Sequence, residues 1–121
     1  MLDNLIIFKN CNDLKFNFNN NLKIKDSLLF NNCSNFNIII NNKINKISLI
    51  NCNNFKLVFR DTISGIDIEK SNEIKIKRNS YHNSNITYIS CFLSTININY
   101  ENESEIRYID INNENSNITF N

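Results

Sequence analysis

Residues 49–59 read Leu-Ile-Asn-Cys-Asn-Asn-Phe-Lys-Leu-Val-Phe, and this pattern recurs along the chain at a nearly constant distance. Each copy is built around a small anchor residue that is usually flanked by asparagine. The anchors are Cys11, Cys33, Cys52 and Ser71, which follow one another after 22, 19 and 19 residues. A looser fifth copy surrounds Cys91, and a sixth is expected around Ser116. Such self-similarity predicts a repeat architecture in which each unit stacks on the next.

Apolar and polar residues alternate after each anchor. In the third copy Phe55, Leu57 and Phe59 stand at the third, fifth and seventh places after the anchor, and Lys56 stands between the first two. The fourth place is polar in all four clear copies: Lys15, Asn37, Lys56 and Lys75. A period of two indicates a strand with one buried face, and isoleucine and phenylalanine are common in strands.

The 121-residue chain is therefore expected to form a single all-β domain over residues 1–121, a single-stranded parallel β-helix of about six coils with 19–22 residues per coil. Each coil is expected to contain two or three short strands, such as residues 47–50, 55–59 and 63–68. An antiparallel β-sandwich also explains the alternation. It leaves the aligned Asn-Cys-Asn triplets as a coincidence, so the β-helix is the favoured prediction.

The chain has 29 asparagines and one glycine, Gly65. The corners of a coil need backbone at positive φ, which asparagine tolerates better than other residues with a side chain. The asparagines that flank the anchors are predicted at these corners, with their amides bonded from coil to coil: Asn10, Asn12, Asn32, Asn51, Asn53 and Asn72.

The cysteines are interpreted as small buried residues with inert, reduced thiols. A disulfide and a zinc site are the alternatives, but anchors 19 or more residues apart lack the close pairs of a zinc motif. His82 is expected to be solvent-exposed and without a catalytic role. We find no catalytic constellation in the sequence, and we expect neither a metal nor a cofactor.

The net charge of +1 gives no general argument for binding nucleic acid or a membrane, and no segment resembles a signal peptide or a membrane helix. A basic stripe is nevertheless predicted on one face, and aromatic residues do not alternate with it as nucleic-acid binding would require. Its residues are Lys15, Lys56, Arg60, Lys75, Lys77 and Arg78. The stripe either docks an acidic protein surface or is only a solvated face that prevents aggregation.

Residues 47–76 resemble the C-terminal domain of the cyclase-associated protein family, which shares a superfamily with tubulin-folding cofactor C. Asn51-Cys52, Leu57-Val58-Phe59 and Ile66-Asp67-Ile68 stand where that family has its Asn-Cys turn and its two apolar strands. The resemblance implies a right-handed β-helix that binds monomeric actin and promotes its nucleotide exchange. It also implies a homodimer formed by exchange of a C-terminal hairpin, which would be residues 101–121 here.

The sequence is therefore interpreted as a non-enzymatic, cytoplasmic protein-binding module that regulates the cytoskeleton. The alternative is a structural, self-assembling β-solenoid, for example of a giant virus or a protist, without a role in actin binding. The family's Pro-Thr-Ile-Ser-Ile-Asp stretch has no counterpart in this proline-free chain, so no binding residue of the family is transferred. The cofactor C branch stimulates GTP hydrolysis through an arginine on a strand, preceded by a glutamine-rich motif. This chain has no glutamine, and Arg60 lies in a different context, which disfavours that activity.

Overall fold

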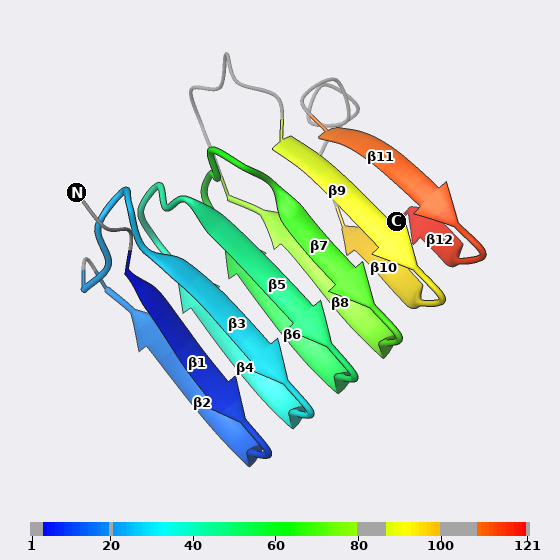
Figure 1. Ribbon diagram of the computed structural model, residues 1–121, viewed down its shortest axis with the longest axis horizontal. Helices are drawn as coiled ribbons and strands as arrows, with labels where there is room; N and C mark the ends of the chain where they lie inside the picture. Colours follow the sequence, from blue (N-terminus) through cyan, green and yellow to red (C-terminus); the bar gives the residue numbers. More distant parts are fainter. Residues whose placement is uncertain (1–3, 20, 80–86, 100–108, 121) are drawn as a thin grey trace.

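A computed structural model of the chain describes residues 4–19, 21–79, 87–99 and 109–120. These residues form strands, tight turns and loops, and no helix occurs among them. The strands lie in two layers, and the chain alternates between the layers as it advances along one axis (Figure 1). The prediction of a parallel β-helix is confirmed, and that of a β-sandwich is wrong.

Within the described residues each layer is a six-stranded parallel sheet. Sheet A contains β1 (Leu5–Lys9), β3 (Ser27–Asn31), β5 (Lys46–Ile50), β7 (Ile66–Glu69), β9 (Thr87–Phe92) and β11 (Ile109–Glu114). Sheet B contains β2 (Asn12–Phe18), β4 (Ser34–Ile40), β6 (Asn53–Phe59), β8 (Asn72–Arg78), β10 (Thr95–Asn99) and β12 (Asn117–Phe120). Each coil contributes one strand to each sheet, and every strand pairs with the equivalent strand of the neighbouring coil.

The core consists of columns of equivalent side chains between the two sheets. In sheet B, Phe36, Phe55 and Ile74 are in register on adjacent strands and are at most 2% exposed. The rings of Phe36 and Phe55 lie 5.4 Å apart, and that of Phe30 from sheet A lies 4.9 Å from Phe55. The apolar side chains of each coil thus cover those of the next, as the alternation of the sequence predicts.

Among the residues that the structure describes, each coil contains two strands and not three. The apolar run of residues 63–68 is only partly a strand, because β7 begins at Ile66 while Ile63 is 55% exposed in a loop. Gly65 separates the two parts at φ +88°, and a Cβ at this position would lie 2.4 Å from the carbonyl oxygen of Tyr88. The glycine therefore allows the loop to pass close to β9.

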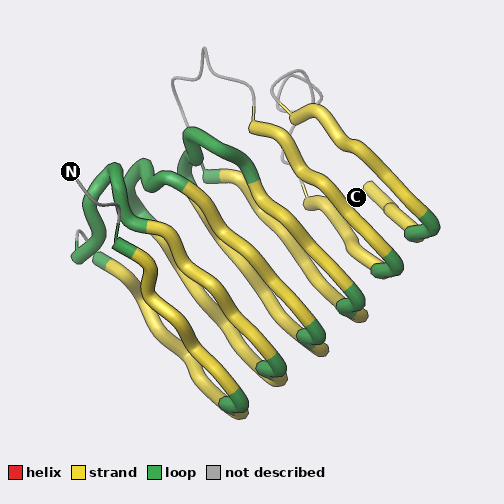
Figure 2. The backbone as a smooth tube through the Cα atoms, viewed as in Figure 1, coloured by secondary structure: helices red, strands yellow, loops and turns green. Residues whose placement is uncertain are grey.

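The two ends of the coil differ. The chain passes from sheet A to sheet B through a tight corner at the anchor residue, and returns through a longer loop (Figure 2). Two residues of this corner have positive φ in each of the first four coils. They are Asn10 and Asp13, Asn32 and Asn35, Asn51 and Asn54, and Lys70 and Glu73.

The prediction of positive φ is therefore correct for three of the six asparagines that flank the anchors. Positive φ is confirmed for Asn10, Asn32 and Asn51, which precede the anchors. It is wrong for Asn12, Asn53 and Asn72, each of which begins a strand of sheet B, and the next residue turns instead. The predicted bonds between coils are present in several rows.

Side-chain amides form these rows along the outside of the tight corner. The Asn32 amide donates to Asn10 Oδ1 at 2.8 Å, and the Asn54 amide donates to Asn35 Oδ1 at 2.7 Å. The Asn35 amide in turn donates to Asp13 Oδ1 at 3.0 Å. Each row connects two or three successive coils, so asparagine satisfies backbone geometry and inter-coil bonding at the same time.

The anchor of the fifth coil is Ser94 and not Cys91. Cys91 lies in β9 in register with Ile68, so its side chain belongs to a core column. Ser94 Oγ accepts a hydrogen bond from the Ser71 N–H at 3.1 Å, as Ser71 Oγ does from the Cys52 N–H at 3.0 Å. The expected sixth anchor is confirmed, since Ser116 Oγ accepts from the Ser94 N–H at 3.0 Å.

Asn51 offers a direct test of the corner backbone. Its φ is 52°, and we expect Asn51→Ala to lower the free energy of unfolding by about 1 kcal/mol because alanine tolerates this region poorly. Asn51→Gly should leave stability within a few tenths of a kcal/mol of the wild type. Urea unfolding followed by circular dichroism measures both variants. Equal losses in the two would show that the side chain, and not the backbone, determines the effect.

Candidate protein-binding face

The lysine column on the outer face of sheet B is the first element of the predicted site. Lys15, Lys56 and Lys75 occupy one register position of β2, β6 and β8, with Asn37 of β4 between the first two. All three lysines are exposed, because strand alternation directs them away from the core columns on either side. Neighbouring strands of a sheet are about 4.8 Å apart, so the ammonium groups of Lys56 and Lys75 reinforce each other's positive potential.

The remaining residues of the predicted stripe are in three different environments. Lys77 lies two residues beyond Lys75 on the same outer face of β8 and is half-buried. Arg60 is exposed but follows the end of β6, so it lies in the loop and not on the sheet. The structure thus brings Lys56, Lys75 and Lys77 together on adjacent strands.

Arg78 does not belong to the exposed stripe. It is 4% exposed and continues the core column of Phe59, and its guanidinium forms an ion pair with the Asp61 carboxylate. Arg78 Nε also lies 3.4 Å from the carbonyl oxygen of Arg60, to which it donates. The sequence already indicated that Arg78 points inward, because it occupies the seventh place after its anchor, where the other copies have Phe59 and other apolar residues.

Shallow hollows flank the lysine column. One hollow of about 350 Å³ lies beside Lys75. It is bordered by the Glu73 carboxylate and by the polar side chains of Thr95, Asn97 and Thr119. A smaller one of about 210 Å³ lies beside Lys56, between Asn35, Asn37 and Asn54. Sequence reasoning did not find these hollows, since they result from short polar side chains next to long ones. The face therefore combines cationic groups with amide and hydroxyl groups that can donate or accept hydrogen bonds.

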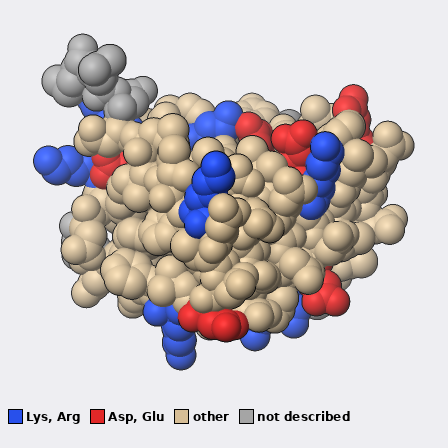
Figure 3. Space-filling view, turned by 60° about the horizontal axis from the view of Figure 1, so that its bottom comes forward, with Lys and Arg blue, Asp and Glu red and all other residues tan. Residues whose placement is uncertain are grey.

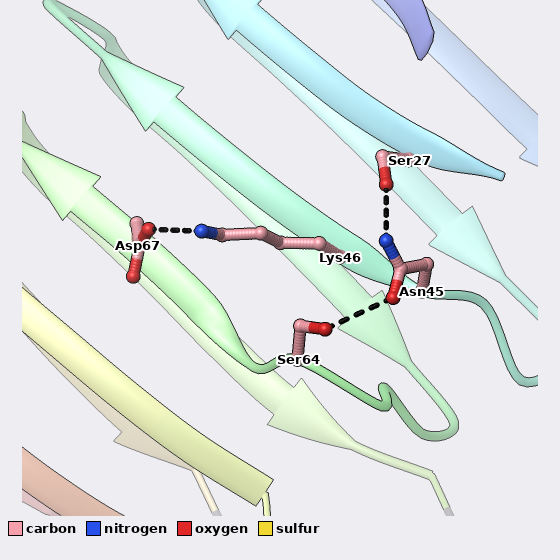
Figure 4. A network of polar contacts seen from close by, with 5 residues as sticks. All are labelled: Ser27, Asn45, Lys46, Ser64 and Asp67. Carbon is pink, nitrogen blue, oxygen red and sulfur yellow. Dashed lines mark hydrogen bonds and ion pairs between the residues drawn. The ribbon is translucent and has the colours of Figure 1, made fainter. Parts of the chain in front are cut away.

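The outer face of sheet A has a different electrostatic character. Lys46 Nζ lies 2.6 Å from Asp67 Oδ2, which neutralises that lysine (Figure 4). Glu69, two residues further along β7 and exposed, adds a carboxylate. At the adjoining loop edge the Asn45 amide donates to Ser27 Oγ, and the Ser64 hydroxyl donates to Asn45 Oδ1, both at 2.9 Å. Figure 3 shows the charged side chains as separate spots on a largely uncharged surface.

The anchor thiols lie in the tight corner and are poorly suited to chemistry. Cys33 Sγ donates to the carbonyl oxygen of Phe8 at 3.4 Å, and Cys52 Sγ donates to that of Phe30 at 3.3 Å. Burial raises the pKa of the Cys52 thiol to about 11 and also raises that of Cys33, so the reactive thiolate is scarce at neutral pH.

Other reactive groups give no site in the part of the chain that the structure describes. Burial also raises the pKa of Cys91 to about 11, and all four cysteines are free. No group of three His, Cys, Asp or Glu side chains suited to a metal ion occurs in residues 4–19, 21–79, 87–99 and 109–120. His82 lies outside the described residues, so the expectation about it stays untested.

Comparison with protein families agrees with this geometry. Residues 6–94 match the family model described as "Adenylate cyclase associated (CAP) C terminal". The chain belongs to this family. The match covers the first four coils and reaches Ser94, the anchor of the fifth. The resemblance based on residues 47–76 is confirmed and extends well beyond them.

A solved structure supports the fold of this CAP C-terminal family member. The chain is similar to the cyclase-associated protein of Cryptosporidium parvum, with a TM-score of 0.56 and 20% sequence identity. The alignment covers 99% of this chain and 59% of that one, so the chain spans little more than half of that protein. Among curated proteins, no sequence matches the chain closely enough to count as a relative. Its described residues contain no helix that is long and apolar enough to cross a membrane.

Proposed function

We propose that this CAP C-terminal domain is a non-enzymatic binding module for monomeric actin, and that sheet B is the face that docks. The observation that carries the proposal is the lysine column of Lys15, Lys56 and Lys75 on adjacent or near-adjacent strands. Membership of the family supports actin as the partner. The same membership supports a cytoplasmic domain that regulates the cytoskeleton as a homodimer.

The docking face needs a partner with an acidic surface. The lysines are exposed and protrude from a nearly flat sheet, while short polar groups line the hollows between them. Long-range attraction would orient an acidic protein onto this face, and the amides and hydroxyls would then form short-range contacts. Arg60 at the end of β6 can reach the rim of such an interface, whereas Arg78 is buried and stabilises the core.

Charge reversal tests this proposal. We expect Lys56→Glu/Lys75→Glu to weaken binding to fluorescently labelled actin monomers by tenfold or more, because the change places two negative charges opposite an acidic surface. Binding by the wild type should also weaken as salt rises, since exposed charges are screened over about 10 Å at 0.1 M.

Lys9→Glu/Lys70→Glu is the matched control. It makes the same change of charge at two exposed lysines outside the lysine column, one in β1 and one at the tight corner. The control should bind as the wild type does. A wild type that does not bind actin monomers would remove the proposal, and equal losses in both double variants would remove the assignment to sheet B.

The C-terminal strands bear on the proposed homodimer. Within one chain β11 pairs in parallel with β9, and β12 pairs in parallel with β10, so both strands extend the solenoid. Residues 100–108, the whole segment between β10 and β11, lie outside the described residues. Exchange of residues 101–121 between two copies stays a prediction.

A further inference from the structure

The outer face of sheet A has a hollow that the docking proposal for sheet B does not use. Its volume is about 320 Å³, and it lies across β7, β9 and β11, which run side by side in Figure 1. We call it the β9 hollow, because Ser90 and Phe92 of β9 lie at its centre and residues of the other two strands border it on either side. β9 is paired on both sides, so the centre of the hollow does not depend on where the described sheet ends.

Phe92 lies in register between two glutamates. Its partner on β7 is Glu69, its partner on β11 is Glu114, and all three residues border the hollow. Phe92 is 36% exposed, and both glutamates are exposed as well. Neighbouring strands are about 4.8 Å apart, so one carboxylate-bearing side chain stands on each side of the ring at this spacing. The face of an aromatic ring carries negative potential, and an adjacent carboxylate adds to it, so this arrangement attracts cations.

The charges of these two glutamates are not neutralised in the part of the chain that the structure describes. Neither Glu69 nor Glu114 forms an ion pair there, whereas Asp67, which also borders the hollow, is paired with Lys46. Lys70 follows Glu69 at the tight corner but forms no ion pair with it. The β9 hollow therefore has the opposite electrostatic sign to the lysine column, and it repels phosphate groups and other anions.

We propose that the β9 hollow binds an arginine side chain of a protein partner, with the guanidinium stacked on Phe92 between Glu69 and Glu114. A guanidinium is planar and carries five N–H donors around its edge, so its face can contact the ring while its edge donates to carboxylates on both sides. Two carboxylates on a surface would not define a site by themselves, but the exposed ring between them does. This site does not rest on the actin proposal, which concerns sheet B.

The first experiment is an NMR titration of the full chain, isotopically labelled, with a short peptide of blocked termini whose only charged side chain is one arginine. We expect the amide shifts to concentrate in β9 and in the adjoining residues of β7 and β11. The same peptide with citrulline keeps the planar end group but lacks the charge, so it should bind about tenfold more weakly. An arginine peptide that does not bind, shifts centred elsewhere, or equal binding of the two peptides would overturn the proposal.

The second experiment removes the ring. Phe92→Leu keeps an apolar side chain but loses the aromatic face, so the arginine peptide should bind about threefold more weakly. Tyr88→Leu is the matched control, because it removes another exposed ring from the outer face of β9. Tyr88 does not border the hollow and lies four residues away, about 13 Å along the strand, so this variant should bind as the wild type does.

The third experiment removes the charges. Glu69→Gln/Glu114→Gln should weaken binding of the arginine peptide by about tenfold and reduce its dependence on salt. Asp13→Asn/Glu73→Gln makes the same change of charge at two exposed carboxylates of the tight corner, outside the β9 hollow, and should bind as the wild type does.

The combined outcome separates a built site from a merely acidic surface. All of these variants change exposed side chains, so their circular dichroism spectra should equal that of the wild type. Loss of binding in the glutamine variant together with full binding by Phe92→Leu would show that two carboxylates suffice, and would overturn the role of the ring. Equal losses in both double variants would overturn the assignment to the β9 hollow.

Discussion

Arg78→Leu is expected to lower the free energy of unfolding by about 3–5 kcal/mol, because it leaves a buried carboxylate without its partner. The guanidinium of Arg78 and the carboxylate of Asp61 form an ion pair whose side chains are 3% and 11% exposed. Arg78 continues the column of Phe18, Ile40 and Phe59, so its charge is in register with an apolar row. Since a domain of this size is stable by about 5–15 kcal/mol, the variant should unfold at a much lower urea concentration.

The double variant Asp61→Asn/Arg78→Leu isolates the cause of this loss. It removes both charges, and leucine suits the apolar column, so most of the lost stability should return. Urea unfolding followed by circular dichroism measures both proteins. A single variant that loses less than about 1 kcal/mol would mean that the Asp61 carboxylate is solvated at little cost, contrary to its burial.

Phe55→Ala is expected to lower the free energy of unfolding by a similar amount, about 3–5 kcal/mol, because it opens a cavity in the core. The ring of Phe55 is fully buried and contacts those of Phe30 and Phe36, one from each sheet. It also lies in register with residues of the coils before and after it, so a cavity here removes contacts in three coils.

Val58→Ala provides the comparison for Phe55, because it removes apolar atoms from the opposite, outer face of the same strand. This residue is half-buried, and its truncation should cost about 1 kcal/mol or less. Thermal unfolding measured by calorimetry separates the two variants. Similar midpoints would contradict the description of β6 as a strand with one buried face.

The repeat made most of the fold predictable. A period of two places Phe55, Leu57 and Phe59 on one face of a strand, and recurrence every 19–22 residues requires the strands to stack in register. Both properties follow from the residues themselves and need no tertiary contact to be recognised. The number of strands per coil was less accessible, since the apolar run of residues 63–68 reads as one strand although Ile63 lies in a loop and β7 begins at Ile66.

The sequence-based prediction was wrong where the residue that it chose lies one to three residues away from the one that takes the role in the structure. The fifth corner has a single positive-φ residue, Leu93, where earlier corners have two. Its anchor is Ser94, three residues beyond the more conspicuous Cys91, as the hydrogen bond from the Ser71 N–H shows. Asn53 and Asn54 are chemically identical, and only the backbone decides which of them turns. For the candidate face, the sequence placed Lys56 and Lys75 together correctly. Arg78 was wrongly included in the stripe, although its seventh place after the anchor, in register with Phe59, indicated an inward side chain.

The difference between the tight corner and the return loop also determines how the molecule can vary in length. Successive anchors are separated by 19 residues between Cys52 and Ser71 but by 23 between Ser71 and Ser94. Strands of the two sheets stay in register through both steps, so the return side absorbs almost all of the extra residues. Insertions and deletions are thus tolerated on the side of the return loops. The tight corners, which asparagines line, keep a constant shape.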